Sequence, residues 1–575
     1  MKRAVLVTVA ILASVGFAAG YLRGKSLAAQ APQVAPADLV LRGGKIITLD
    51  AGTPEAQALA SRGGKIVAVG TNDAIARYVG PNTQVVELNG QLAVPGLIEG
   101  HGHFSGVGEN RINLDFMNTK SWDEIVHMVA LAVETAKPGQ WIIGRGWHQD
   151  KWTGKPNPNV EGFPLHFSLD KVSPNNPVVL THASGHASFV NQKAMELSGI
   201  TKATANPTGG EVLKDKDGNP TGLMRESAQR LVRRPPPTEE EVRKQLALSD
   251  EEVIGKGITT FHDAGAQFGQ IDVLKKMIDE GKMHVRLWTM VREPNAALLQ
   301  NIDKYRVIGY GNGMLTIRAI KVTADGALGS RGAWLLEPYA DKPDSSGLRP
   351  DTVDTLPATA KIAIDHKMQL CVHAIGDRAN REVLNIYEDA FKKNNVNGKD
   401  LRWRIEHAQH ISAADIPRFG ALGVIASMQA IHATSDGTWV PDRLGDKRSE
   451  EGAYVWQKLM KSGAVVTNGT DAPVENVDPI PNYYAAVTRK LSNGKVFYPD
   501  QRMSRMEALR AATIQNAIAA FEEDVKGSLT VGKYADVTVF SKDITTVPDE
   551  EIKTAKIAYT IIGGKIAYSG QKLIR

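Results

Sequence analysis

Hydrophobic and polar positions alternate in two different ways along this 575-residue chain. Towards both ends, short runs of β-branched and apolar residues are broken by Gly-Gly or Asn-Gly, as in DLVLRGGKIITLD (38–50) and KIAYTIIGGKIAYSG (556–570). Such runs predict β-hairpins. Because neither terminal part alone can cover a sheet face, we expect residues 36–95 and 525–575 to form one small β-sandwich together.

The pattern changes in residues 96–524, where short apolar strands alternate with helical stretches. Runs such as HVRLWTMV (284–291) and LTIRAIKVT (315–323) predict strands, and segments such as EVLNIYEDAFKKN (382–394) predict helices. Repeated strand–helix units over this length predict an α/β fold, a (β/α)8 barrel of the TIM type. A stretch rich in Pro, Gly and Asn, at about residues 150–230, is expected to be an insertion in this barrel.

The first 35 residues have a composition of their own. Lys2 and Arg3 precede an uncharged apolar stretch, residues 4–22, and small residues follow up to an Ala-x-Ala at 29–31. This layout is typical of a bacterial export signal, so we expect an exported, periplasmic protein. Because the apolar stretch is long for a signal, an uncleaved membrane anchor is the alternative.

Charge and cysteine content exclude several classes of function. The chain has 68 Lys and Arg against 63 Asp and Glu, a formal charge of +5. Four of the basic residues and no acidic residue lie before position 36, so the rest of the chain is close to neutral. We therefore expect no binding to nucleic acid, and membrane contact only through an uncleaved N-terminal segment. Cys371 is the single cysteine, which excludes an intrachain disulfide.

Polar side chains gather where the predicted strands end. The strand in VPGLIEGHGHF (94–104) ends in His101 and His103, whose i, i+2 spacing points both imidazoles to one side. The carboxyl ends of barrel strands face the active site, and two neutral imidazoles at this spacing are suited to binding a metal. A lone pair of this kind could also be a loop histidine beside a hydrogen-bonded one. The other strand ends, however, add Lys321, His373, His407 and Asp471.

The chain resembles the amidohydrolase superfamily, in its amidohydrolase-3, YtcJ-like branch, from about residue 37 to the end. Several strings in fixed order carry the resemblance, among them VPGLIEGHGHF, GRGWHQDKW, IKVTADGALGSRGAWL, HAIGDRAN, RIEHAQH and GTDAPVE. One departure is Glu99, which stands where the superfamily pattern has Asp. A longer carboxylate there could still orient the imidazole of His101 or His103.

The resemblance implies two divalent metal ions, with zinc as the first choice. The ligand set that it implies is His101, His103, Lys321, His373, His407 and Asp471. His101 and His103 would bind the more buried ion, and the later two histidines would bind the second. Lys321 would bridge the ions as a carbamate, N6-carboxylysine. Judged from the residues alone, Lys321 could instead pair with Asp325, four residues on.

The resemblance further implies a metal-dependent hydrolase of non-peptide carbon–nitrogen bonds, such as N-substituted or cyclic amides. Hydroxide activated by the metals would attack the carbonyl of a small-molecule substrate, with Asp471 as general base and then general acid. In isolation, the GTDAP string could equally place Asp471 in an Asx turn. An esterase or carbamate hydrolase would need the same residues and is the alternative. A non-catalytic exported binding or regulatory protein is less favoured, because none of the six positions is lost. A homodimer could form.

Four further residues are candidates for substrate binding: His186, His432, Trp147 and Arg331. Either histidine could reach the carbonyl or acyl group of the substrate, or could be a wall histidine. Trp147 could line an apolar pocket or pack inside the inserted segment. Arg331 could anchor the substrate or tie down its own loop.

Overall fold

The structure is a computed structural model that describes residues 34–570 and 572–574. The chain divides into two units, 1–35 and 36–575, and the fold described below is that of the second. The predicted export signal, residues 1–35, lies outside the described residues except for its last two. In the described ranges, no helix combines the length and the apolar character needed to cross a membrane.

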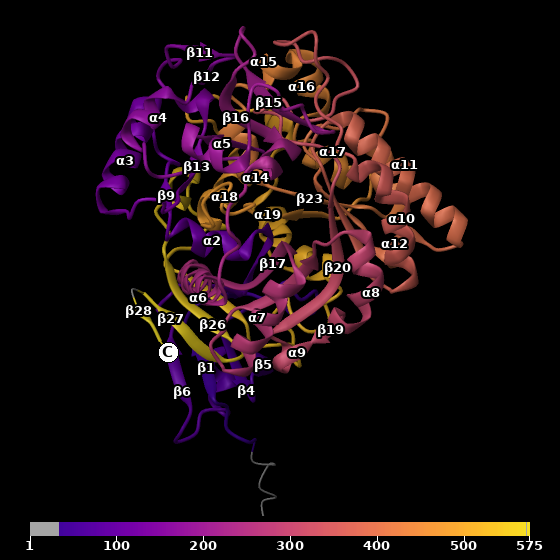
Figure 1. Cartoon of the computed structure of the whole chain (residues 1–575). Helices are drawn as coiled ribbons and strands as arrows, with labels where there is room; N and C mark the ends of the chain where they lie inside the picture. Colours follow the sequence, from indigo (N-terminus) through magenta and orange to yellow (C-terminus); the bar gives the residue numbers. More distant parts are fainter. Residues whose placement is uncertain (1–33, 571, 575) are drawn as a thin grey trace, which may run out of the picture. The chain divides into compact units, whose positions relative to one another are not determined.

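Eight parallel strands form the central sheet, of which β17, β20 and β23 are labelled in Figure 1. They follow one another in chain order: β8 (Leu97–Gly102), β17 (Ile258–Ala266), β18 (Arg286–Val291), β20 (Leu315–Thr323), β21 (Gln369–Ala374), β22 (Arg404–His407), β23 (Ile425–Met428) and β24 (Val466–Asn468). The short β19 (Val307–Gly309) adds an antiparallel pairing to β20. Eight parallel strands in this order make a nearly closed barrel, which confirms the predicted (β/α)8 fold.

Backbone contacts join the first and last barrel strands at their carboxyl ends. The N–H of Asp471 donates to the carbonyl oxygen of His101 at 2.7 Å, and the N–H of His103 donates to that of Ala472 at 2.7 Å. Below them, the side-chain amide of Asn516 donates to one backbone carbonyl of β8 at 2.9 Å and one of β24 at 3.0 Å. The contacts that close the barrel therefore also hold three of the predicted ligands in place.

Helices between the strands cover the outside of the barrel. They include α6 (Glu239–Gly255), α7 (Phe268–Asp279), α8 (Asn295–Tyr305), α10 (Thr352–Asp365), α11 (Asp377–Asn394), α13 (Ile416–Leu422), α17 (Trp456–Lys461) and α18 (Pro479–Thr488). Helix α6 shows how the sequence specifies such an element. Thr238 and Glu241 form a capping box at its start, and Val242, Leu246 and Val253 recur at helical spacing on its buried face.

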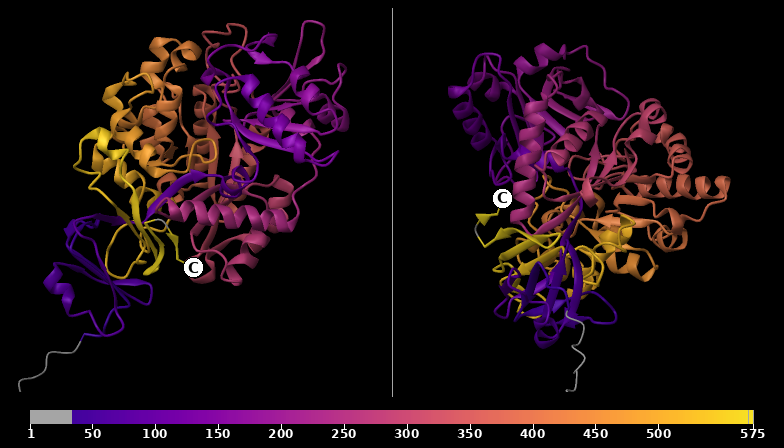
Figure 2. Two further views of the ribbon diagram at one scale, coloured as in Figure 1. Left: turned by 90° about the vertical axis from the view of Figure 1, so that its left-hand side faces the viewer. Right: turned by 90° about the horizontal axis from the view of Figure 1, so that it is seen from below.

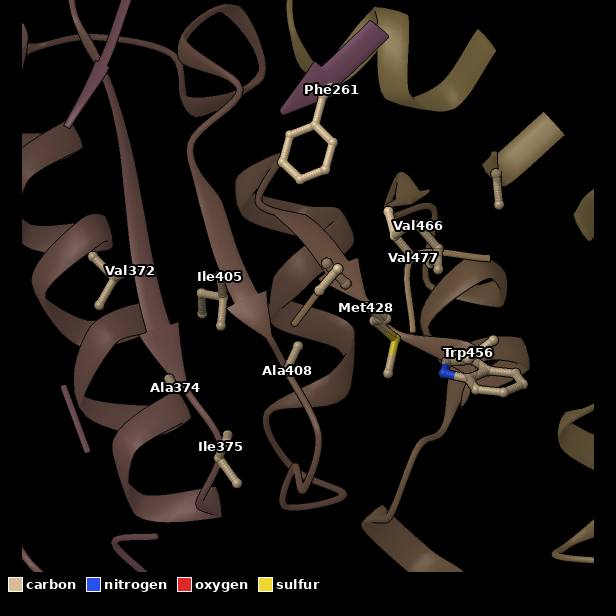
Figure 3. Close-up of a cluster of buried hydrophobic side chains, with 14 of the residues drawn as sticks. Phe261, Val372, Ala374, Ile375, Ile405, Ala408, Met428, Trp456, Val466 and Val477 are labelled. Atoms are coloured by element: carbon tan, nitrogen blue, oxygen red, sulfur yellow. The ribbon is translucent and has the colours of Figure 1, made fainter. Parts of the chain in front are cut away.

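Apolar side chains of the strands and helices interlock into one large cluster, part of which is shown in Figure 3. Ile405 on β22 and Val466 on β24 belong to this cluster together with Trp456 at the start of α17. All three side chains are almost inaccessible to water. Burial of this kind contributes roughly 25 cal/mol per Å² of apolar surface, which fixes the strands and, with them, the polar side chains at the strand ends.

Strands from both chain ends share a sheet. Its seven strands run in the order β28 (Lys572–Leu573), β27 (Lys565–Ser569), β26 (Ile557–Ile562), β25 (Val537–Phe540), β7 (Leu92–Pro95), β2 (Lys45–Ile47) and β3 (Glu55–Ala56). A four-stranded sheet has the order β5 (Lys65–Gly70), β4 (Ala58–Arg62), β1 (Leu39–Arg42) and β6 (Gln84–Glu87). The two ends lie side by side in Figure 2, and one apolar cluster joins Leu39 and Leu41 to Val537 and Val539. That the two sheets constitute a sandwich stays a prediction.

Deletion of residues 527–575 should make the chain aggregate or be degraded. The deletion removes β25, which pairs with β7, and uncovers the buried side chains of Leu39 and Leu41. Exposed apolar surface of this kind promotes association. Soluble yield and size-exclusion profile, compared with the full chain, measure the effect. A monodisperse, active deletion variant would show that the two chain ends do not depend on each other.

An inserted sheet separates β8 from β17 in the sequence. Its strands have the order β15 (Gly210–Lys214), β16 (Pro220–Glu226), β14 (Ala187–Val190), β13 (Val178–His182), β10 (Ile142–Trp147) and β9 (Leu114–Asp115). The insertion thus begins near Leu114, earlier than the expected residue 150. The reason is that α3 (Trp122–Thr135) and β10 have the alternation of a barrel unit, whereas β8 pairs directly with β17 and leaves them outside.

Candidate metal centre

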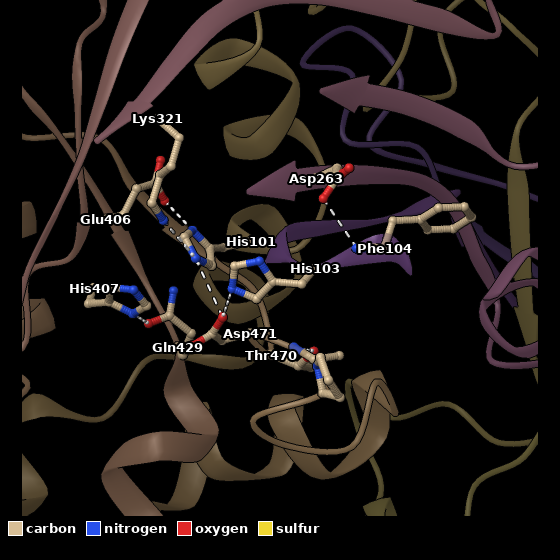
Figure 4. A network of polar contacts seen from close by, with 12 residues as sticks. His101, His103, Phe104, Asp263, Lys321, Glu406, His407, Gln429, Thr470 and Asp471 are labelled. Atoms are coloured by element: carbon tan, nitrogen blue, oxygen red, sulfur yellow. Dashed lines mark hydrogen bonds and ion pairs between the residues drawn. The ribbon is translucent and has the colours of Figure 1, made fainter. Parts of the chain in front are cut away.

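The six predicted ligands converge on the carboxyl ends of the barrel strands, and Figure 4 shows five of them. The imidazole centroid of His407 lies 4.7 Å from that of His101 and 4.4 Å from that of His373. One ligand atom each of His101, His407 and Asp471 can be chosen so that the three lie within 4.8 Å of one another. This convergence comes from strands that are up to 370 residues apart in the chain.

Two imidazoles are oriented by acceptors on neighbouring strands. Nδ1 of His101 lies 2.5 Å from Oε2 of Glu406, and Nδ1 of His407 lies 2.8 Å from Oε1 of Gln429. Both partners are oxygen acceptors, so in each pair Nδ1–H is the donor. Burial holds the pKa of His407 well below its usual value, so this imidazole stays neutral. A neutral imidazole with its second nitrogen tied to an acceptor is the form that binds metals.

Asp471 lies among the imidazoles, on the segment that follows β24. Its Oδ1 is 3.2 Å from Nε2 of His103 and 3.5 Å from Nε2 of His101. The backbone of Asp471 has a φ of +58°, and that of His407 has a φ of +75°, both in the left-handed region. Such conformations cost of order 1–3 kcal/mol each and occur preferentially at functional sites.

Lys321 and His373 complete the group. Lys321 is only 4% exposed, its Nζ lies 3.4 Å from Nε2 of His101, and burial lowers its pKa. The alternative ion pair with Asp325 is not among the contacts of the described residues. Asp325 instead accepts hydrogen bonds from three backbone N–H groups, at 2.7 to 2.9 Å. Nε2 of His373 is buried without a hydrogen-bond partner.

These observations fit a site for divalent cations. Neutral imidazoles and a carboxylate are the donors that zinc and related ions prefer. Nε2 of His373 makes no hydrogen bond and lies 3.5 Å from Oδ1 of Asp325, so a metal ion would give this buried nitrogen a direct partner. A bare ammonium at Lys321 would also be costly at this depth.

Glu99 does not contact the imidazole of His101 or His103, which the sequence suggested it could orient. Its carboxylate accepts the backbone N–H of Thr470 at 2.6 Å, the hydroxyl of Thr470 at 3.0 Å and the backbone N–H of His101 at 3.3 Å. Burial raises the pKa of Glu99 to about 8. The side chain therefore ties β8 to the segment that carries Asp471 and orients neither imidazole. Glu406 has the orienting role, and the alternation in RIEH, which turns it into the barrel, is the signal that could have identified it.

The metal centre lies where two cavities meet. One, of about 50 Å³, is bordered by His148, Leu328 and Trp439. The other is a wide cleft of about 1030 Å³. The linings of both cavities include Ser184, His186, His373, His407, Asp471 and Val474. A bound molecule can therefore extend from the metal centre to either side.

The four substrate-binding candidates divide into two pairs. His186 lines both cavities, with its ring 4.8 Å from that of His373 and its Nδ1 2.7 Å from Oε2 of Glu226. His432 lines the small cavity and stacks on His407, with 6.4 Å between ring centroids.

Trp147 and Arg331 lie away from both cavities. Trp147 is fully buried in the apolar core of the insertion, and its Nε1–H donates to the carbonyl oxygen of Leu180 at 2.9 Å. Nη2 of Arg331 lies 2.8 Å from Oδ2 of Asp341, an ion pair within its own loop. Neither is retained as a substrate-binding residue, because the side chain of each is already used in packing or pairing.

Comparisons with known proteins agree with this geometry. A sequence model described as the amidohydrolase family matches residues 84–568. YtcJ of Bacillus subtilis (strain 168) is 30% identical over 541 residues, covering 92% of this chain and 99% of its own length. The N-substituted formamide deformylase of Arthrobacter pascens is 25% identical over 545 residues, covering 92% and 98%. The crystal structure of an uncharacterized metal-dependent hydrolase from Pyrococcus horikoshii OT3 aligns with a TM-score of 0.70 and 24% identity, covering 89% of this chain and 99% of that one. The chain belongs to the amidohydrolase family.

Proposed function

We propose that this protein hydrolyses a non-peptide carbon–nitrogen bond of a small molecule, such as an N-substituted or cyclic amide, with divalent metals at the centre described above. The observation that carries the proposal is the convergence of neutral imidazoles, Asp471 and the buried Lys321 on one point between two cavities. The similarity to a formamide deformylase over almost the whole chain supports this bond type.

Six residues would hold two metal ions, for which zinc is the first candidate: His101, His103, Lys321, His373, His407 and Asp471. Such ions polarise a substrate carbonyl and bring the pKa of a bound water close to neutrality. Glu406 and Gln429 keep the two imidazoles that they contact in the metal-binding orientation. The carboxylate of Asp471 accepts the proton of the attacking water and returns it to the departing nitrogen, which would otherwise leave as a poor amide anion.

His186 and His432 are proposed to contact the substrate, because both border the small cavity beside the metal centre. His186 is held by Glu226 and His432 by Gln409, whose Nε2 lies 3.1 Å from Nδ1 of His432. Each ring therefore has one nitrogen engaged by the protein. The other nitrogen is available to the carbonyl or acyl group of a substrate.

A substrate screen tests the bond type. Formamides, acetamides, cyclic amides, carbamates and esters with the same substituents are compared at a fixed concentration of metal-loaded protein. Turnover of amides above that of the matched esters supports the proposal. Turnover confined to esters or carbamates would assign the same centre to the alternative reaction. No turnover of any class, with metal bound, would favour a binding protein.

Lys321 is proposed to be a carbamate. Its amine would react with CO2 and lose a proton, which replaces a costly buried cation by an anion with two oxygens. We expect metal-free protein to regain activity with metal plus bicarbonate, and poorly with metal in CO2-depleted buffer. Lys321→Ala should bind less metal, and added formate should partly restore binding. Reactivation that ignores bicarbonate, with no CO2 adduct in the native mass of the loaded protein, would remove the carbamate but leave the histidines as ligands.

A further inference from the structure

The wide cleft carries positive charge close to the metal centre. Three arginines from different elements line it: Arg145 on β10, Arg230 in the short helix η2 (Ser227–Leu231) and Arg292 just after β18. None of the three pairs with a carboxylate among the described residues. The small cavity has Lys151 and no arginine in its lining. The guanidinium groups therefore lie on the side of the wide cleft.

Arg145 contributes a half-buried guanidinium beside Asp471. Its Nη2 donates to the carbonyl oxygen of Ala183 at 2.9 Å, and its Nε donates to that of Pro473 at 3.4 Å. Both acceptors are neutral, and no ion pair of Arg145 is found among the described residues, although the carboxylates of Asp471 and Glu109 act on its charge from further away. Pro473 is only two residues from Asp471, which places this charge at the edge of the metal centre.

Arg292 contributes a second charge, beside Lys321. Its Nη2 donates to Oγ1 of Thr323 at 3.3 Å, and Thr323 lies two residues beyond Lys321 on β20. The side chains of Arg292 and Lys321 both flank Gly265. A Cβ atom at this glycine would lie 3.1 Å from Cβ of Arg292 and 3.5 Å from Cβ of Lys321. Arg292 is exposed, and Arg230 lines the same cleft.

The acidic groups of the cleft are largely committed to other partners. Asp325 accepts three backbone N–H groups, and Glu226 holds His186. Glu293 accepts the backbone N–H of Phe268 at 2.9 Å. Asp351 lies exposed at the start of α10. The three guanidinium groups therefore remain available to an anion that enters from solvent.

We propose that the substrate carries a carboxylate on the part that lies in the wide cleft, where Arg145 and Arg292, assisted by Arg230, bind it. A guanidinium presents N–H donors in a planar fork that matches the two oxygens of a carboxylate. This proposal rests on the proposed function, because it names the substrate class of the same centre. It predicts an amide substrate that has a small group on one side of the scissile bond and a carboxylate on the other.

Matched ligands test this on the metal-loaded full chain. The probes are 4-(formamidomethyl)benzoate and 4-(acetamidomethyl)benzoate, each compared with the compound that has a carboxamide in place of the carboxylate. Turnover gives kcat/KM for each probe. Calorimetry gives the affinity for the aminomethyl product of each probe, or for the probe itself where it is not hydrolysed. We expect a preference for the carboxylate of at least about ten-fold, since hydrogen bonds to charged groups contribute roughly 1.5–3 kcal/mol. The preference should shrink as salt is raised.

Three variants localise the effect. Arg292→Gln should lose most of the preference for the carboxylate over the carboxamide. Arg292→Lys keeps the positive charge but not the planar fork of donors, so it should retain part of the preference for the carboxylate. Arg243→Gln is the matched control, because Arg243 lies on α6, pairs with Glu239 and Glu280, and lines neither cavity.

The outcomes separate this proposal from the proposed function. Equal binding and turnover of carboxylate and carboxamide would overturn the carboxylate site while leaving the hydrolase intact. A preference in calorimetry that Arg292→Gln removes, without turnover of any amide, would support the carboxylate site and contradict the amide reaction. A fourth variant, Arg145→Gln, completes the test: a preference that survives in both Arg292→Gln and Arg145→Gln would show that other groups recognise the anion, which also overturns the assignment.

Discussion

His407→Ala should lose both bound metal and turnover. The substitution removes an imidazole that lies among those of His101 and His373 and whose Nδ1 is held by Gln429. Loss of an indirect partner of a metal ligand costs roughly 10–100-fold in affinity or activity, so loss of the ligand itself should cost at least about 100-fold. Metal content per chain and kcat/KM for a cleaved amide measure the two effects.

His410→Ala is the control for this substitution. His410 is a buried histidine three residues on, packed against Tyr454 with 5.4 Å between ring centroids, and it lines neither cavity. The exchange leaves a similar void and should reduce thermal stability while metal content stays unchanged. If both variants lose metal equally, the loss reflects general destabilisation. If His407→Ala keeps full metal and rate, the assigned site is wrong.

Asp471→Asn should separate catalysis from metal binding. The amide can still act as a weak ligand but cannot take up and return a proton. We therefore expect most of the metal to remain and kcat to fall by about 10²–10⁴-fold, the contribution of general acid–base catalysis. Asp478→Asn is the matched control, since Asp478 caps α18 and pairs with Lys256 outside the centre. Equal losses of metal and rate in Asp471→Asn would assign Asp471 to ligation alone.

The barrel and the ligand positions could be predicted because they depend on local patterns. His101 lies on β8, and His103 lies just past its end with extended backbone, so the i, i+2 spacing expected from strand geometry applies to both. Apolar runs that end in a polar side chain likewise identified β20, β21, β22 and the segment after β24. Parallel strands in chain order then bring those ends to one face.

The partners of these residues could not be predicted, because they depend on contacts between distant segments. Glu406 is 305 residues from His101, and Thr470 is 371 residues from Glu99. The alternation in RIEH indicates that Glu406 faces the barrel interior, but not which imidazole it contacts. The early start of the insertion has a similar cause. The segment from Leu114 to Trp147 has the strand–helix alternation of a barrel unit, and only the direct pairing of β8 with β17 shows that it lies outside.

The position of Trp147 also depends on contacts between distant segments. The sequence left open whether Trp147 lines a pocket or packs the inserted segment, and its strand belongs to the inserted sheet and not to the barrel. Its indole therefore packs against Phe163 and Phe189 inside the insertion. His186, from the same inserted sheet, does reach the centre, because it begins the turn into β14 at the edge that faces the barrel.

Metal titration of the chelated protein tests the central claim most directly. Metal content is measured by mass spectrometry of the elements, and turnover of an N-substituted formamide is followed at each ratio of metal to protein. We predict that chelation abolishes turnover, that zinc restores it, and that activity reaches its plateau at two ions per chain. Full turnover by protein shown to be free of metal would contradict the account.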